Sequence, residues 1–174
     1  MGTGIVVCGL NGAGKSTLGE ALAKRLNFYF IDNEALYFPK TDTDYCYAFA
    51  RTREEASRML FEEIGAHRDF VFSCVKGDYG ERIRPFIHLV VELNTPKDVR
   101  MRRVRSRSFG RFGARMLPGG DLYEREEAFF ELVQSRTEDA VEKWLRTLSC
   151  PVLRLDGTKP VEENVRLIIG RIKL

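Results

Sequence analysis

The chain has 174 residues, of which 44% are hydrophobic and 30% charged, and its formal net charge is +3. A chain of this size buries roughly 70% of its unfolded surface. We therefore expect one globular domain over residues 1–174 and exclude a disordered or repetitive protein. No apolar stretch approaches the ~18 residues that cross a bilayer, and the first residues lack a secretory signal pattern. These features predict a cytoplasmic protein.

Charge and cysteine usage argue against two further classes of function. The 28 basic residues face 25 acidic ones, a balance too even to require a nucleic-acid partner, although arginines gather at residues 100–115 and acids at 121–131. A zinc site is not expected, because no Cys-x-x-Cys spacing occurs and the chain has only two histidines. Free thiols are the better interpretation of the four scattered cysteines, Cys8, Cys46, Cys74 and Cys150.

Predicted strands and helices alternate along the chain. Short apolar runs predict five strands, at residues 5–8, 28–31, 70–74, 87–93 and 152–155. Helical spacing and capping patterns predict helices at residues 15–26, 52–67, 95–107, 121–148 and 160–172. Apolar strands that alternate with helices are typical of a parallel sheet covered on both faces. We therefore predict an α/β fold, a three-layer sandwich with a five-stranded parallel sheet.

A glycine-rich turn separates the first strand from the first helix. Its residues, Gly9-Leu-Asn-Gly-Ala-Gly14-Lys15-Ser16, match the phosphate-binding pattern G-x-x-x-x-G-K-[ST]. Glycines let backbone N–H groups approach phosphate oxygens, and the helix N-terminus attracts the same anion. Lys15 is expected at the β- and γ-phosphates, with the Ser16 hydroxyl on Mg²⁺. The predicted ATP contacts in this turn are Gly9, Asn11, Gly12, Ala13, Gly14, Lys15, Ser16 and Thr17.

This motif, on a chain of fewer than 200 residues, resembles the small P-loop kinases, the group of adenylate, shikimate and nucleoside-monophosphate kinases. The resemblance extends to residues 99–107 and to Asp156-Gly157-Thr158. It implies a P-loop NTPase fold with a mobile helical lid, and ATP with Mg²⁺ as the phosphoryl donor. It also implies that the loop that contains Lys159 lies beside the adenine; the same residues suit a plain turn before a helix.

The arginine run is the predicted lid, approximately residues 103–121. Arg103 and Arg107, four residues apart, share one face of a helix, and the resemblance implies that such arginines reach phosphate. Arg111 and Arg115 lie in the glycine-bearing segment that follows, which has the composition of a flexible lid. Arg103, Arg107 and Arg111 are our predicted catalytic arginines. A solvated basic face or an RNA-binding stripe is the alternative.

An acid pair follows the second predicted strand, at the edge where open α/β sheets bind ligands. Shikimate-type kinases have a similar pair there, and the resemblance implies that Asp32 and Glu34 handle Mg²⁺ and the acceptor hydroxyl. Asp32 alternatively caps a helix. The third strand ends in Ser73-Cys74 where many P-loop enzymes place an acid, so Asp32, Glu34, Ser73 and Asp78 remain alternatives for the Mg²⁺ shell. This departure argues against a standard adenylate kinase.

The region at residues 32–68 is the predicted acceptor-binding region. Aromatic residues and arginines suit a flat or anionic acceptor, although ordinary core packing explains them equally well. Arg51 is our predicted acceptor contact within this set of side chains, Tyr37, Phe38, Tyr45, Tyr47, Phe49, Arg51, Arg53 and Arg58.

The resulting hypothesis is an ATP-dependent kinase of a small molecule, a nucleoside, nucleotide or hydroxy metabolite. Lys15, Asp32 and the lid arginines are its predicted catalytic residues, and Ser16 and Asp32 its metal site. Membrane partners are not expected, nucleic acid is disfavoured, and a monomer or homodimer is expected. The rivals are a P-loop NTPase or RNA-end kinase, and an ATP-binding module without catalysis.

Overall fold

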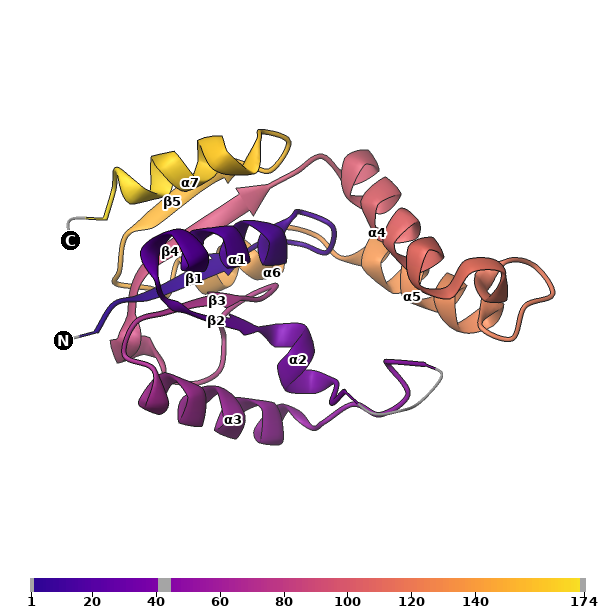
Figure 1. Ribbon diagram of the computed structural model, residues 1–174, viewed down its shortest axis with the longest axis horizontal. Helices are drawn as coiled ribbons and strands as arrows, with labels where there is room; N and C mark the ends of the chain where they lie inside the picture. Colours follow the sequence, from indigo (N-terminus) through magenta and orange to yellow (C-terminus); the bar gives the residue numbers. More distant parts are fainter. Residues whose placement is uncertain (1, 41–44, 173–174) are drawn as a thin grey trace.

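The computed structural model describes residues 2–40 and 45–172. Residues 41–44, within the predicted acceptor region, lie outside the described part. Five parallel strands form one sheet in the order β2-β3-β1-β4-β5, as predicted (Figure 1). Their bounds are Gly4–Cys8 for β1, Tyr29–Asp32 for β2, Phe70–Ser73 for β3, Ile87–Asn94 for β4 and Val152–Asp156 for β5.

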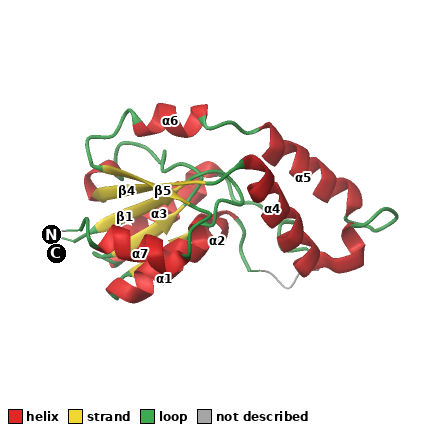
Figure 2. Ribbon diagram, turned by 90° about the horizontal axis from the view of Figure 1, so that it is seen from above, coloured by secondary structure: helices red, strands yellow, loops and turns green. Residues whose placement is uncertain are grey.

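Helices cover both faces of this sheet, so the three-layer sandwich is confirmed. On one face, Ile5 and Val7 pack against α1, Lys15–Leu26, and α7, Val161–Ile169. On the other face, Val6 and Cys8 pack with α3, Arg53–Ala66, and α6, Asp139–Leu145. Alternate residues of the central strand thus serve opposite cores, as the two-residue period of a strand requires. Figure 2 shows α6 on the opposite side of the strands from α1 and α7.

Two helices project from the end of the sandwich as an arm, which we define as residues 97–135 (Figures 1 and 2). Helix α4 spans Lys97–Phe112, the short 3₁₀ helix η2 spans Gly113–Met116, and α5 spans Tyr123–Ser135. The arm has its own small core, in which Val104 and Phe130 are almost fully buried. Helix α4 therefore continues five residues beyond the predicted end at Arg107, into the segment expected to be flexible.

The predicted long helix at residues 121–148 is wrong, because the chain forms two helices, α5 and α6. Their separation occurs at residues 136–138, here called the α5–α6 junction, where two polar side chains contact other segments instead of continuing a helix. Arg136 donates to Asn11, and Glu138 pairs with Arg100. The break redirects the chain from the arm to the face of the sheet.

Besides η2 of the arm, two short helices were not among the predicted elements, although a helix capped by Asp32 was the stated alternative for that residue. Helix α2, Asn33–Tyr37, directly follows β2, and the 3₁₀ helix η1, Arg84–Phe86, precedes β4. Helix α3 has the predicted capping box, in which Thr52 and Glu55 bond reciprocally. Among the described residues, none of the helices combines the length and apolar character that crossing a bilayer requires.

Candidate functional site

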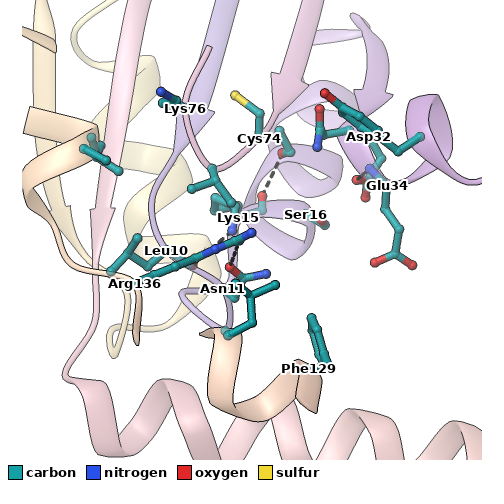
Figure 3. Close-up of a pocket in the computed structure, with 18 of the residues that line it drawn as sticks. Leu10, Asn11, Lys15, Ser16, Asp32, Glu34, Cys74, Lys76, Phe129 and Arg136 are labelled. Carbon is teal, nitrogen blue, oxygen red and sulfur yellow. Dashed lines mark hydrogen bonds between the residues drawn. The ribbon is translucent and has the colours of Figure 1, made fainter. Parts of the chain in front are cut away.

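A cavity of about 830 Å³ lies at the carboxyl ends of β1, β2 and β3, between the sandwich and the arm. The predicted residues that line it are Asn11, Gly12, Lys15, Ser16, Asp32, Glu34 and Arg107, and the weaker candidates Tyr37, Phe38, Tyr45, Tyr47, Arg53, Ser73 and Asp78 line it too. Figure 3 shows Lys15 and Ser16 between Asn11 and Arg136 on one side and Asp32 and Glu34 on the other. The fold thus brings the phosphate-binding motif and the acid pair to one cavity.

The loop between β1 and α1 has the backbone that its glycines permit. Gly12 and Gly14 have φ of +81° and +100°, the left-handed region that side chains other than glycine rarely adopt. The first turn of α1 has no side-chain cap, so among the described residues its first N–H groups have neither an intrahelical nor a side-chain partner. Open N–H groups at a helix N-terminus suit an anion, and this donor set fits the phosphates of ATP.

Lys15 points back over this loop. Its Nζ donates to the Leu10 carbonyl at 3.0 Å. Burial lowers the pKa of Lys15 to about 8, and the nearby charge of Arg107 acts in the same direction. Protonation of a buried lysine is costly when no anion is near. A bound phosphate stabilises the protonated form and removes that cost.

Asp32 performs the capping role that was the alternative to function, and it also lines the cavity. Its Oδ1 accepts from the Glu34 N–H at 2.9 Å as the N-cap of α2. In the described part of the chain, Oδ2 has no hydrogen-bond partner. Asp32 lies beside Ser73 in the sheet register, and the Ser73 hydroxyl donates to the Lys15 carbonyl at 3.0 Å. The two roles are compatible because they use different oxygens.

The other proposed carriers of the metal shell are less suited to it. Asp78 lines the cavity, but its carboxylate lies 3.5 Å from both Arg53 and Lys76. Cys74 occupies the position of the missing acid, and burial raises its pKa well above the usual value, so it stays a neutral thiol. Hard cations prefer oxygen ligands, and the Ser16 hydroxyl and the free Asp32 oxygen provide them.

The arginines of the arm divide into paired and unpaired members. Arg103 donates to the carbonyls of Gly12, Ala13 and Gly157, and so joins the phosphate-binding loop to the loop after β5. Arg105 pairs with Glu127 at 3.0 Å. Within the described ranges, Arg107 has no protein partner although it lines the cavity. Arg107 is therefore the member of the run best placed to meet a phosphate.

The last two arginines of the run bind acids. Arg115 pairs with Asp121 at 2.6 Å. Arg111 pairs with Glu34 at 3.0 Å and also donates to the Tyr47 hydroxyl. The contact between Arg111 and Glu34 joins the arm to α2 across the cavity mouth, so Glu34, predicted as an acceptor contact, is already engaged by a cation.

Like Arg103 and Arg111, the predicted contacts Arg51 and Lys159 lie outside the cavity lining. Arg51 donates to the carbonyls of Ala35 and Leu36 at the end of α2. Lys159 is exposed and lies 3.9 Å from Glu163 of α7. Arg53, two residues beyond Arg51, does line the cavity and donates to the Asp78 carbonyl at 2.5 Å. The remaining residues of the motif, Gly9, Ala13, Gly14 and Thr17, shape the loop without lining the cavity.

Sequence reasoning missed several lining residues, of which Arg136 is the most prominent. Its Nη1 donates to Asn11 Oδ1 at 2.6 Å, and Figure 3 shows it beside Lys15. The run Thr137-Glu138-Asp139 has the composition of a helix start and could have revealed the junction. Further missed residues are Lys76, Tyr79, Phe129 and Thr137. No local pattern marks them, because they come from three separate segments.

The wall opposite the arm rests on the chain's one tryptophan. Trp144 of α6 is 5% exposed, and a Cβ built on Gly77 would lie 2.7 Å from its ring. Gly77 therefore lets the loop that carries Lys76 and Asp78 lie directly on the indole.

Known proteins resemble this chain in sequence and in fold. A family model described as an AAA domain matches residues 5–111. The chain is 31% identical over 175 residues to the uncharacterized protein YqaC of Bacillus subtilis, covering 95% of this chain and 94% of that protein. It is 40% identical over 60 residues to a shikimate kinase of Haemophilus influenzae, 34% of this chain and 33% of that enzyme.

A solved structure extends the likeness to the whole fold. The crystal structure of shikimate kinase from Bacteroides thetaiotaomicron has a TM-score of 0.60 and 21% identity to this chain, covering 100% of both. At that identity the likeness concerns the architecture of the sheet and its helices.

Proposed function

Because the chain belongs to the AAA-domain family of P-loop proteins, we propose that it is an ATP-dependent kinase of a small molecule. The observation that carries the proposal is one cavity lined by Lys15, Arg107 and Asp32. It brings a phosphate-binding lysine, an unpaired arginine and a carboxylate together. The partial sequence match to the shikimate kinase of Haemophilus influenzae supports a hydroxyl-bearing acceptor as the first class to test.

The residues divide the work of phosphoryl transfer between them. The loop N–H groups and Lys15 bind the triphosphate, and Ser16 with Asp32 holds Mg²⁺, which neutralises phosphate charge when bound. Arg107 stabilises the charge that develops on the transferring group. The acceptor oxygen forms a bond to the γ-phosphorus while the bond to the departing ADP breaks. Asp32 orients that hydroxyl, and the hydroxyl proton leaves with the transferred phosphoryl group.

The pairing of the arginines favours a small acceptor over RNA. Of the arm's basic run, Arg105, Arg111 and Arg115 are held by acids of this chain, and Arg103 is held by backbone carbonyls. An electrostatic RNA-binding stripe requires unpaired cations along one face. The paired arrangement supports arginines that organise the cavity.

The test is ATP consumption with Mg²⁺ across a panel of hydroxy acids, sugars, nucleosides, nucleotides and RNA. One acceptor class should raise turnover, and Lys15→Ala should lower that turnover at least ~10²-fold while thermal unfolding stays unchanged. Lys24→Ala, an exposed lysine of the same helix, is the matched control. ATP binding without turnover for any acceptor would instead support a binding module, and stimulation by RNA alone would support the RNA-end kinase.

A further inference from the structure

Asn11 of the phosphate-binding loop is contacted by arginines from both ends of the arm. Arg136, immediately after α5, donates to its Oδ1 at 2.6 Å. Arg100, in the first turn of α4, donates to its carbonyl at 3.5 Å. The two points at which the arm leaves and rejoins the sandwich therefore meet at one residue of the loop.

Arg100 contacts three segments that are far apart in the sequence. Besides the Asn11 carbonyl, its Nε donates to the Thr95 carbonyl at 3.0 Å, and its Nη2 lies 3.6 Å from Glu138 Oε1. Arg100 is only 3% exposed. A planar guanidinium can serve three directions at once, and here they are the end of β4, the phosphate-binding loop and the α5–α6 junction.

These contacts fix which way the loop faces. The backbone of Arg100 packs on Gly12 so closely that a Cβ there would lie 2.4 Å from the Arg100 carbonyl oxygen. The Ala13 carbonyl accepts from the Thr95 hydroxyl and from Arg103. Carbonyls of residues 11–13 thus point toward the base of α4. Because the N–H and C=O of a trans peptide point in opposite directions, the N–H groups of Gly12 and Gly14 point away from the base of α4, whereas the Ala13 N–H donates to the Leu10 carbonyl at 3.1 Å.

We propose that Arg100 is a positioning residue that joins the phosphate-binding loop to the α5–α6 junction. A displacement of the arm moves Glu138 relative to Arg100, and through Arg100 it changes the orientation of the loop. The same connection works in reverse, because coupling between two sites is reciprocal. This inference rests on the proposed nucleotide site, and it goes further by assigning a role to a residue outside the cavity lining.

The test uses two variants of the connection and one control. Glu138→Gln removes the charge of a side chain that is 64% exposed, so the fold should tolerate it. Arg100→Lys keeps the charge but has no planar fork to bridge three partners. Asp98→Asn is the control, because it breaks an exposed pair of the same helix, with Arg102 at 3.7 Å, that contacts neither loop nor junction.

Hydrogen exchange of the amides at residues 11–14, without nucleotide, is the first measurement. Both variants should speed their exchange at least threefold while the amides of β4 exchange as in the parent, and Asp98→Asn should change nothing. The Kd for MgATP should rise roughly three- to tenfold in the variants. A merely structural role would instead loosen the sheet and the loop together.

Each outcome has a distinct meaning. Parent-like exchange at residues 11–14 in Glu138→Gln and in folded Arg100→Lys overturns the proposal, and if Arg100→Lys does not fold, Glu138→Gln alone decides. Failure of the parent to bind MgATP would refute the proposed function. The exchange measurement contains no nucleotide, so the connection is tested in either case.

Discussion

The two sides of the cavity are held together by different kinds of contact. On the nucleotide side, Thr95, Arg100 and Arg103 bond to backbone carbonyls of the loop. On the acceptor side, separate segments meet through side-chain tips, such as Arg111 on Glu34 and Tyr45 on Glu126. Contacts to backbone leave little freedom, whereas exposed ion pairs separate at little cost. The comparison teaches that the loop of the proposed nucleotide side is held more firmly, and we propose that any opening occurs on the proposed acceptor side.

The largest expected effect tests the unpaired arginine against a paired one. Arg107→Ala should lower kcat by about 10²-fold to 10³-fold, because Arg107 faces the cavity and acts on transition-state charge. The Kd for MgATP should change less than about threefold. Arg105→Ala is the control, since Arg105 is held by Glu127 and lies over the Phe130 ring. Steady-state kinetics with the identified acceptor measures kcat, and calorimetric titration measures the Kd for MgATP. Equal small losses of kcat in Arg107→Ala and Arg105→Ala would contradict the assignment.

Next in size is a change to the rigidity of the nucleotide side. Gly12→Ala should lower the free energy of unfolding by roughly 2 kcal/mol, because Gly12 combines a positive φ with the close approach of Arg100. Gly65→Ala, in α3 with open space around it, should be neutral or stabilising by up to ~1 kcal/mol. Urea unfolding measures the free energy of unfolding of each variant and of the parent. Equal values for Gly12→Ala and the parent would contradict the prediction and show that the loop relaxes around the added Cβ.

Opening of the acceptor side should respond more modestly. Arg111→Gln removes the contact with Glu34, whose side chain is 39% exposed. The fraction of molecules in which the arm is separated from α2 should therefore rise about two- to fivefold. Proteolysis within residues 45–51 should accelerate by that factor, and salt should have the same effect on the parent. Arg102→Gln, which removes only the exposed pair with Asp98, is the control, and unchanged cleavage after Arg111→Gln would refute the contact as a closure.

The smallest expected effect is the uptake of a fraction of a proton by Lys15 when MgATP binds. Because burial lowers the pKa of Lys15 to about 8, about half of the free protein carries neutral Lys15 at pH 8. Bound phosphates favour the charged form, so the pKa rises on binding and the complex takes up as much as ~0.5 proton at pH 8. At pH 6 Lys15 is already charged and uptake from it vanishes. Calorimetry in two buffers of different ionisation enthalpy measures this, and equal uptake at both pH values would contradict it.

The nucleotide side of the cavity could be predicted from the sequence better than the acceptor side. Lys15 and its loop could be predicted because strand, turn and helix are contiguous and the motif is local. The five strands could be predicted because each is a short apolar run. By contrast, the helix at residues 121–148 was predicted as continuous because Val133 and Val141 keep helical spacing across the break. The break itself depends on Asn11 and Arg100, more than thirty residues away.

The acceptor side depends even more on distant contacts. Arg51 and Arg53 look equivalent in the sequence, yet Arg51 caps α2 and Arg53 lines the cavity. The difference comes from the turn into α3, where Thr52 is the N-cap, so neighbours point to opposite sides. The pairing of Glu34 with Arg111 joins residues far apart in the chain, which no local pattern shows.

The position of Trp144 has an optical consequence. The chain contains one tryptophan, so red-edge excitation selects a single indole, buried against the loop that carries Lys76 and Asp78. Its emission colour and intensity depend on the polarity and motion of that loop. The protein therefore carries its own fluorophore beneath this loop of the cavity wall, and ligand titrations need no attached dye.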